Sequence, residues 1–188
     1  MYIQGALMKY NKTITIKDGR KCLLRNGTSG DGKTVLECFN KCHRETDFLL
    51  TYPDENTFTA ELEAEYLQSK TDSGNEIEII SVVDGVVAGT AGIDSIGGKE
   101  KIKHRAEFGI SVLKEYWGLG IGRALTDACI ECAREAGYLQ LELDVVADNK
   151  NAVALYESVG FVEYGRNPLG FRSRISGMQE LILMRLEL

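Results

Sequence analysis

Apolar residues recur along the chain at two spacings, every second residue in some stretches and every third or fourth residue in others. Alternation is typical of half-buried strands, and the longer period is typical of amphipathic helices. These patterns predict strands over residues 76–83, 86–96, 103–113, 138–146, 160–165 and 178–188, and helices over residues 33–44, 57–70, 120–136 and 149–158.

The N-terminal part of the chain predicts a β-hairpin. Residues 12–26 have an extended pattern on both sides of Asp18-Gly19, a dipeptide that favours two-residue hairpin turns. We therefore place a hairpin within residues 1–26, followed by a loop over residues 27–32.

Polar residues mark where several helices begin. Thr57 or Thr59 is suited to cap the helix over residues 57–70. Asp148 is suited to cap the short helix over residues 149–158. Residues 165–180 are polar and rich in arginine, and they are predicted to be a loop between the last two strands.

The order of elements predicts the fold class. A hairpin, two helices, three strands, a helix, a strand, a helix and two strands form an α/β (α+β) domain spanning residues 1–188. We expect a mixed, mostly antiparallel central sheet of about seven strands, flanked by about four helices.

Composition narrows the classes of function. The 188 residues are 44% hydrophobic and 27% charged, with a net charge of −6. Excess negative charge argues against a general nucleic-acid binder, but is compatible with an acidic cleft that attracts amines. No apolar run approaches the roughly 18 residues of a membrane span, and the N-terminal apolar stretch is too short for a secretory signal. We therefore expect a cytoplasmic protein with no membrane partner.

The five cysteines are expected to be reduced, because their number is odd and no signal precedes them. Cys129 and Cys132 form a C-x-x-C pair, which can be a zinc half-site or a redox pair. Both histidines are isolated and no second pair follows, so we interpret these cysteines as the buried stripe of a helix and predict no metal. Cys38 and Cys42, one helical turn apart, receive the same interpretation.

Three glycines precede the helix over residues 120–136: Gly118, Gly120 and Gly122. Their spacing fits neither the dinucleotide fingerprint nor the phosphate-binding P-loop. A glycine-rich turn before a helix N-terminus nevertheless suits an anion, because free N–H groups and the helix dipole favour negative charge. Arg123 would then contact phosphate or ribose. The alternative is a tight turn that needs positive φ angles.

A second stretch, LELDVVADNKNAVALYESVGF, makes the sequence resemble the GNAT superfamily of N-acetyltransferases. The family signature V-x-x-x-N-x-x-A-x-x-L-Y-x-x-x-G-F falls on Val145, Asn149, Ala152, Leu155, Tyr156, Gly160 and Phe161. The glycine turn falls on the family's [QR]-x-x-G-x-[GA] motif, with Trp117 where the family usually has Gln or Arg. The resemblance covers residues 76–188, and implies an acetyl-CoA-binding core over residues 76–165.

The resemblance implies acetyl-CoA as co-substrate. In the family the pantetheine arm lies between two splayed strands and bonds to exposed backbone, here near Ser111 and Val112. The pyrophosphate would sit on the N–H groups of Gly118, Leu119, Gly120, Ile121, Gly122 and Arg123. Asn149 resembles the asparagine that bonds the pantetheine portion, and its alternative role is a second helix cap. Trp117 is expected to pack against the adenine end or a neighbouring helix.

Family chemistry assigns roles to three further residues. Tyr156 resembles the tyrosine that protonates the departing thiolate, which is reasonable because phenols and thiols have comparable pKa values. Asp144 and Glu107 are the two candidates for the general base, and an ordered water chain without a single base is the alternative. Arg166, Arg172 and Arg174 would either bind an acceptor carboxylate or form an exposed basic loop that reaches a partner subunit.

Two classes of function follow. The first is an N-acetyltransferase that moves acetyl from acetyl-CoA to a primary amine by direct attack in a ternary complex. The second is a non-catalytic acyl-CoA sensor, which would need the glycine turn and Asn149 but neither Tyr156 nor a carboxylate. A general phosphate-ligand binder leaves the second signature unexplained. The acceptor is left open among small amines, amino acids and peptide N-termini, and the resemblance makes a homodimer possible.

Overall fold

The computed structural model describes residues 7–188. A hairpin forms from β1 (Asn11–Thr15) and β2 (Lys21–Asn26), as predicted. Residues 1–6, which belong to the range predicted for this hairpin, lie outside the described residues.

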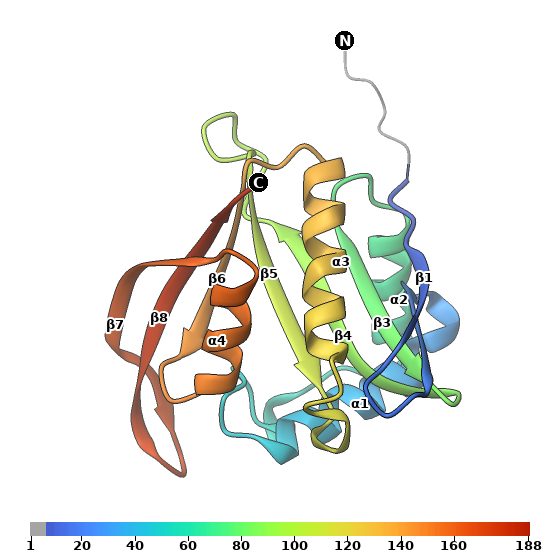
Figure 1. Cartoon of the computed structure of the whole chain (residues 1–188), viewed down its shortest axis with the longest axis horizontal. Coiled ribbons are helices and arrows are strands. Elements are labelled where there is room, and N and C mark those ends of the chain that lie inside the picture. The colour runs from blue at the N-terminus through green and yellow to red at the C-terminus, as the bar shows by residue number, and fades with distance from the viewer. Residues whose placement is uncertain (1–6) are drawn as a thin grey trace.

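Within residues 7–188, eight strands form one sheet in the order β1-β2-β3-β4-β5-β6-β8-β7 (Figure 1). The remaining strands are β3 (Ile77–Val83), β4 (Val86–Ser95), β5 (Arg105–Val112), β6 (Gln140–Val146), β7 (Val162–Ser173) and β8 (Gly177–Glu187). All neighbouring strands are antiparallel except β5 and β6, which are parallel. The mixed, mostly antiparallel sheet is confirmed, with eight strands rather than about seven.

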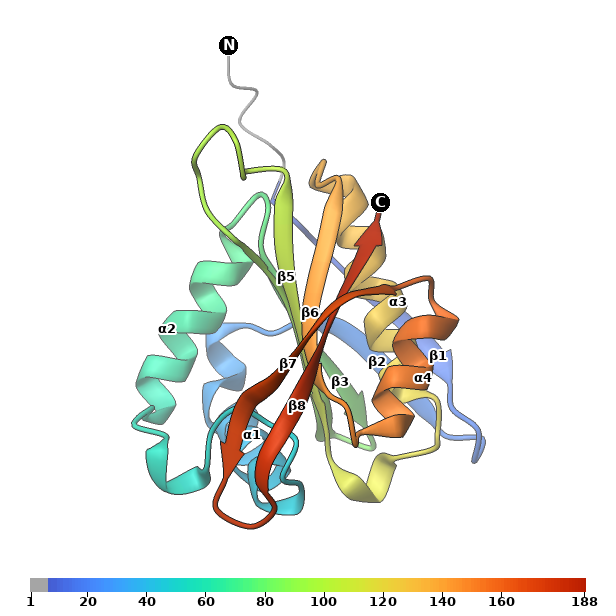
Figure 2. The same ribbon diagram turned by 90° about the vertical axis from the view of Figure 1, so that its left-hand side faces the viewer.

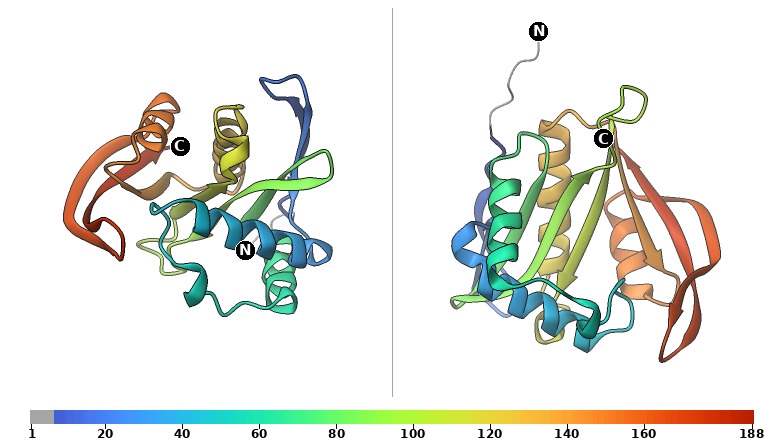
Figure 3. Two further views of the ribbon diagram at one scale, coloured as in Figure 1. Left: turned by 90° about the horizontal axis from the view of Figure 1, so that it is seen from below. Right: turned by 180° about the vertical axis from the view of Figure 1, so that it is seen from behind.

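Helices cover both faces of the sheet, α1 and α2 on one side and α3 and α4 on the other (Figure 2). They are α1 (Gly32–Glu45), α2 (Ala60–Thr71), α3 (Ile121–Glu135) and α4 (Lys150–Ser158), and short 3-10 turns occur at Ser29–Asp31, Pro53–Glu55 and Lys114–Tyr116. The predicted helices are confirmed in number and place. Figure 3 shows α1 and α2 in front of the sheet when the molecule is seen from behind.

The two parallel strands separate soon after they meet. Residues 105–107 of β5 pair with residues 140–142 of β6. Beyond that point β6 is paired with β8 alone. Residues 108–112 of β5 therefore have no strand partner on the β6 side, and the strands run apart toward the bottom of Figure 1. Their free N–H and C=O groups must be satisfied by side chains, water or a ligand.

The core fills both faces of the sheet with aliphatic and small side chains. Cys129 and Cys132 lie buried on α3 as free thiols, and so do Cys38 and Cys42 on α1, which confirms that both pairs lie on the buried side of a helix. On the α4 side, Phe108, Tyr156 and Phe161 form an aromatic cluster with ring centroids 5.9–6.4 Å apart. This cluster fixes α4 against β5.

The stretch predicted as a loop over residues 165–180 is mostly strand. β7 continues to Ser173, and β8 begins at Gly177. No residue of β7 is buried, so the strand has no apolar face that a sequence pattern could reveal. It is held as an edge strand by its backbone pairing with β8.

The start of α4 also differs from the prediction. Asn149, not Asp148, is the N-cap, and its side-chain oxygen accepts from the N–H of Ala152 at 3.3 Å. The two residues are adjacent and both suit the position, so the sequence alone does not separate them. For α2, Thr59 is the cap, one of the two threonines expected.

Candidate active site

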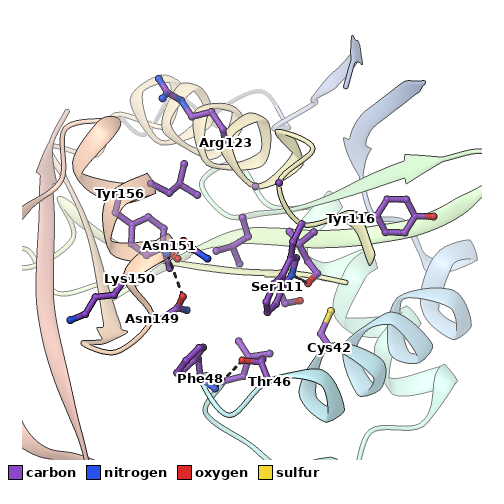
Figure 4. A pocket seen from close by; sticks show the side chains of 18 of the residues that line it. Cys42, Thr46, Phe48, Ser111, Tyr116, Arg123, Asn149, Lys150, Asn151 and Tyr156 are labelled. Atoms are coloured by element: carbon purple, nitrogen blue, oxygen red, sulfur yellow. Dashed lines mark hydrogen bonds between the residues drawn. The ribbon is translucent and has the colours of Figure 1, made fainter. Parts of the chain in front are cut away.

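The gap between β5 and β6 opens into a cavity of about 640 Å3. Its walls are the end of β5, the glycine turn, the first turns of α3 and α4, and the segment that follows α1 (Figure 4). The two sequence motifs, some 30 residues apart in the chain, thus face one space.

The glycine turn combines both interpretations drawn from the sequence. Gly118 and Gly120 have φ of +77° and +94°, values that side chains disfavour, so the turn does need glycine. A Cβ at either position would meet no heavy atom within 4 Å, so the space in front of the turn is also open. Gly120 is the N-cap of α3 and no side chain caps the helix, which leaves its first N–H groups available to an anion.

Gly122 has a different role from the other two glycines. It lies within α3, and a Cβ there would make ordinary contact with Leu155 of α4 at 3.6 Å. A Cβ would therefore fit between the two helices, and their spacing does not require glycine at this position.

Three cationic side chains line the cavity: Lys17, Arg123 and Lys150. Arg123 pairs with Asp127 at 2.9 Å and donates to Ser158, and Lys150 donates to the carbonyl of Ala147 at 2.6 Å. Lys17 was not anticipated from the sequence. It comes from the hairpin turn, whose backbone N–H at Lys17 binds the carbonyl of Leu119 in the glycine turn at 3.1 Å.

Tyr156 lies on α4 with its side chain toward the cavity (Figure 4). Only 7% of it is exposed, and burial raises the pKa of its phenol above the ordinary value. The hydroxyl is therefore protonated at neutral pH, as a proton donor must be. Asn149, at the base of the same helix, also lines the cavity while capping α4 through its oxygen.

Trp117 is hydrogen-bonded to β5, the strand whose last residues have no partner on the β6 side. Its indole nitrogen donates to the carbonyl of Val112 at 2.7 Å, and 45% of the residue remains exposed. Trp117, Ser111 and Val112 all line the cavity. A ligand that bonds the Val112 carbonyl would share it with the indole.

Glu107 and Asp144, the two candidate bases, are brought together where β5 and β6 separate. Glu107 is the Cα partner of Asp94 on β4 and of Glu142 on β6, and Asp144 lies two residues beyond Glu142. Burial, then the charges of Asp144, Asp94 and Glu142, raise the pKa of Glu107; burial and Glu142 raise the pKa of Asp144. Arg105 neutralises Glu142 through a two-point ion pair.

A second cavity, of about 540 Å3, lies on the opposite face of the sheet beneath α1 and α2. It shares Leu49, Ile110 and Ser111 with the first cavity, so the two meet at β5. Most of its wall comes from residues 35–66, a part of the chain in which the sequence predicted helices but no site.

The arginines of the β7–β8 region lie away from both cavities. Arg166 pairs with Glu163 and Glu180, and Arg174 pairs with Asp54 and contacts Glu55 at 3.5 Å. Arg174 therefore reaches the edge of the second cavity only through Glu55. Arg172 is exposed on β7.

Among residues 7–188, no group of three or more potential metal ligands comes together. No helix in that range has the length and apolar character needed to span a bilayer.

The sequence model of the acetyltransferase (GNAT) family matches residues 37–161. The chain belongs to this family. The match extends the resemblance seen in the sequence toward the N-terminus, into α1.

Individual relatives agree with this assignment. L-amino acid N-acyltransferase MnaT of Escherichia coli K12 is 24% identical over 77% of this chain and 82% of its own length. [Ribosomal protein bS18]-alanine N-acetyltransferase of the same strain is 45% identical over 56 residues, which are 30% of this chain and 38% of that protein. A GNAT-family acetyltransferase of Streptococcus pneumoniae superposes with a TM-score of 0.85 at 27% identity, covering 89% of this chain and 99% of its own.

Fold, site and family together define an acetyl-CoA-dependent N-acetyltransferase that acts on an amine. The chain's own geometry fits the co-substrate at two points: an uncapped helix N-terminus behind glycines with open space, and unpaired backbone on β5.

Proposed function

We propose that the protein binds acetyl-CoA in the first cavity and transfers its acetyl group to a primary amine. The amine would enter through the second cavity, on the other face of the sheet. The observation that carries this proposal is the meeting of two cavities at Ile110 and Ser111, with Tyr156 on the wall of the first. Direct attack in a ternary complex needs such a meeting point, because both substrates must be bound at once.

Each part of the first cavity has a proposed task in holding coenzyme A. The N–H groups from Gly118 to Arg123 receive the pyrophosphate, and the free backbone of β5 near Ser111 and Val112 bonds the pantetheine arm together with Asn149. Lys17, Arg123 and Lys150 supply the positive charge that the phosphates need in a protein with a net charge of −6.

The chemistry requires three proton transfers. The acceptor enters mainly as an ammonium ion, and Asp144 or Glu107 takes its first proton directly or through water. The amine nitrogen then forms a bond to the thioester carbon as the carbon–sulfur bond breaks, and the hydroxyl of Tyr156, protonated at neutral pH because burial raises its pKa, donates its proton to the departing thiolate. The nitrogen gives its second proton, directly or through water, to the phenolate left on Tyr156, which yields the neutral amide and restores the tyrosine.

The test is an acetyl-CoA consumption assay with a panel of amines, repeated with the Asp144→Asn and Glu107→Gln variants. We expect acetylated amine and free CoA in equal amounts. Release of CoA that no amine accelerates would contradict the proposal.

Two expectations from the sequence remain predictions. One is the cytoplasmic location. The other is a homodimer, which sedimentation equilibrium of the purified chain tests directly by giving either one or two times its mass.

A further inference from the structure

The second cavity has an unusual lining for an amine-binding site. Its apolar part includes Phe39, Leu49, Phe58 and the ring of Tyr66. Its polar part includes four carboxylates, Glu55, Glu63, Glu78 and Asp94. Among the described residues, no lysine or arginine lines it. Glu63, Glu78 and Asp94 lie on α2, β3 and β4, and Glu55 lies in the 3-10 turn that precedes α2. None of the four is among the residues that both cavities share.

Glu63 is the clearest sign that something is meant to bind there. The residue is 8% exposed and lines the cavity, and within residues 7–188 its side chain makes no hydrogen bond or ion pair. Its carboxylate oxygens are not among the fully buried side-chain atoms without a partner, so what exposure they keep is toward the cavity, where a ligand can reach them. Burial alone raises its pKa above the ordinary value.

Glu78 faces the same space from β3. Its carboxyl lies over Gly92 of β4, where a Cβ would collide with it. Burial is the main reason that its pKa is raised to about 8, with Asp94 and Glu63 adding to the effect and a hydrogen bond from Thr90 opposing it. Lys70, the nearest cation, is already bound to Glu76 and Asp94.

We propose that the second cavity binds an acceptor amine that carries a second cationic group on an apolar stem, such as an alkyl diamine. The reacting amine would lie at Ile110 and Ser111, and the distal cation would lie between Glu63 and Glu78. The aromatic rings would cover the stem and add cation–π attraction. This inference rests on the proposed function, and it narrows the acceptor to one chemical class.

The same lining disfavours an acceptor with a free carboxylate. An acceptor carboxylate would enter beside Glu63 and Glu78, whose raised pKa values show that the cavity already disfavours negative charge, and no lysine or arginine lines the wall to receive it. The arginines of the β7–β8 region do not supply that charge either, because Arg166 and Arg174 are paired elsewhere. This differs from what the name L-amino acid N-acyltransferase implies for MnaT.

Three acceptors with one stem separate these possibilities: 1,5-diaminopentane, pentylamine and 5-aminopentanoate. They differ only in whether the distal group is positive, neutral or negative. Calorimetric titration of each into the CoA-saturated protein measures binding without needing transfer. The same three kinds of compound with propyl and octyl stems test other distances between the two end groups.

We expect the diamine of at least one stem length to bind about tenfold more tightly than its monoamine, and the amino acid to bind more weakly than both. Glu63→Gln and Glu78→Gln should bring the diamine-to-monoamine ratio toward one. The matched control is Glu65→Gln, an exposed carboxylate on the same helix that lines neither cavity, and it should keep the wild-type ratio.

Equal binding of monoamine and diamine at every length, or equal ratios in Glu63→Gln and Glu65→Gln, would overturn the inference. Circular dichroism checks each variant for folding, and Glu78→Gln provides the second measurement if Glu63→Gln does not fold. Acetyl transfer to monoamines without diamine preference would sustain the proposed function and refute this inference. Preferential binding of a diamine with no acetyl transfer to any amine would refute the proposed function and leave the second cavity as a diamine-binding site.

Discussion

Tyr156 lines the first cavity, and within residues 7–188 its hydroxyl has no hydrogen-bond partner. Its ring is held by Phe108 and Phe161, so replacing it with phenylalanine removes the hydroxyl and keeps the packing. We expect Tyr156→Phe to lower kcat by roughly 100-fold, the usual worth of a positioned general acid. Affinity for CoA, measured by calorimetry, should stay near that of the wild type.

Tyr10→Phe is the control for this experiment. The hydroxyl of Tyr10 bonds Glu131 on the surface, and the residue lines neither cavity. It should keep the wild-type kcat. A wild-type kcat in Tyr156→Phe would remove Tyr156 from the mechanism.

The pH dependence of kcat/KM tests the two candidate bases. A base must be deprotonated to act, so activity should rise with pH through its pKa. Because the pKa of Glu107 and that of Asp144 are both raised, the rise should occur above the range of an ordinary carboxyl group. The variant that removes the true base, Asp144→Asn or Glu107→Gln, should no longer show this rise of activity with pH. Its kcat/KM should also be about 100-fold lower than that of the wild type.

The charge of Asp144 helps to raise the pKa of Glu107, whereas the pKa of Asp144 is raised by burial and Glu142. If Glu107 is the base, Asp144→Asn should therefore move the rise in activity toward lower pH without abolishing it. If Asp144 is the base, Glu107→Gln should leave that rise near its wild-type position. An unchanged profile in both variants would point to the water chain instead.

At the scale of elements, α3 carries its own control for the glycine turn. Gly120 precedes the helix and Gly137 follows it, with φ of +94° and +80°, and a Cβ at either would meet no atom within 4 Å. A valine at either position therefore strains the backbone in the same way. Only Gly120 faces the first cavity.

We expect Gly120→Val to abolish CoA binding, and Gly137→Val to lose stability while still binding CoA. Calorimetry with CoA, at a temperature where both variants remain folded, makes the comparison. Similar affinities in the two variants would show that the turn does not receive the phosphate.

The elements that the sequence predicted are those with a buried face. The strands from β3 to β6 and the four helices each have apolar residues at a clear period, and their bounds agree with the structure to within a few residues. β7 was missed beyond Gly165 because both its faces are exposed and its strand form comes from pairing with β8.

The candidate site was likewise predicted only in part. The glycines and the Asn149–Tyr156 motif are each local in the chain, so the sequence located the first cavity. The second cavity is formed by α1, α2 and their connection against β3 and β4, and no short pattern encodes that meeting. Lys17 and Glu63 could be found only once distant segments were packed together.

For the whole molecule, acetyl-CoA should act as a stabilising ligand. At about 100 times its dissociation constant it should add about 2.7 kcal/mol to the free energy of unfolding. For a chain of this size the melting temperature should rise by roughly 5–10 °C. Differential scanning calorimetry measures the shift, and no shift at millimolar acetyl-CoA would contradict the binding of this co-substrate.

Stability should also depend on pH through Glu78. Its pKa is about 8 in the folded protein and near 4.5 when unfolded, so between these values the folded state holds more protons. Raising the pH across this range therefore destabilises the fold. The charged groups around it are Asp94 on β4 with Glu63 and Lys70 on α2, and Tyr66 also faces it.

Glu78→Gln removes this dependence. The melting temperature of the variant should exceed that of the wild type by several degrees at pH 8, and by much less at pH 5. Parallel melting curves at both values of pH are the measurement. A constant difference would mean that Glu78 titrates normally.

The meeting of the two cavities at β5 has a consequence for how such a protein can diverge. The walls of the first cavity come mainly from residues 110–156, and those of the second cavity come mainly from residues 35–94. With coenzyme A proposed for the first cavity and the amine for the second, mutations in the earlier segment should change which amine is accepted without changing the acyl donor. A chimera that exchanges the first hundred residues with a relative should therefore inherit the relative's choice of amine.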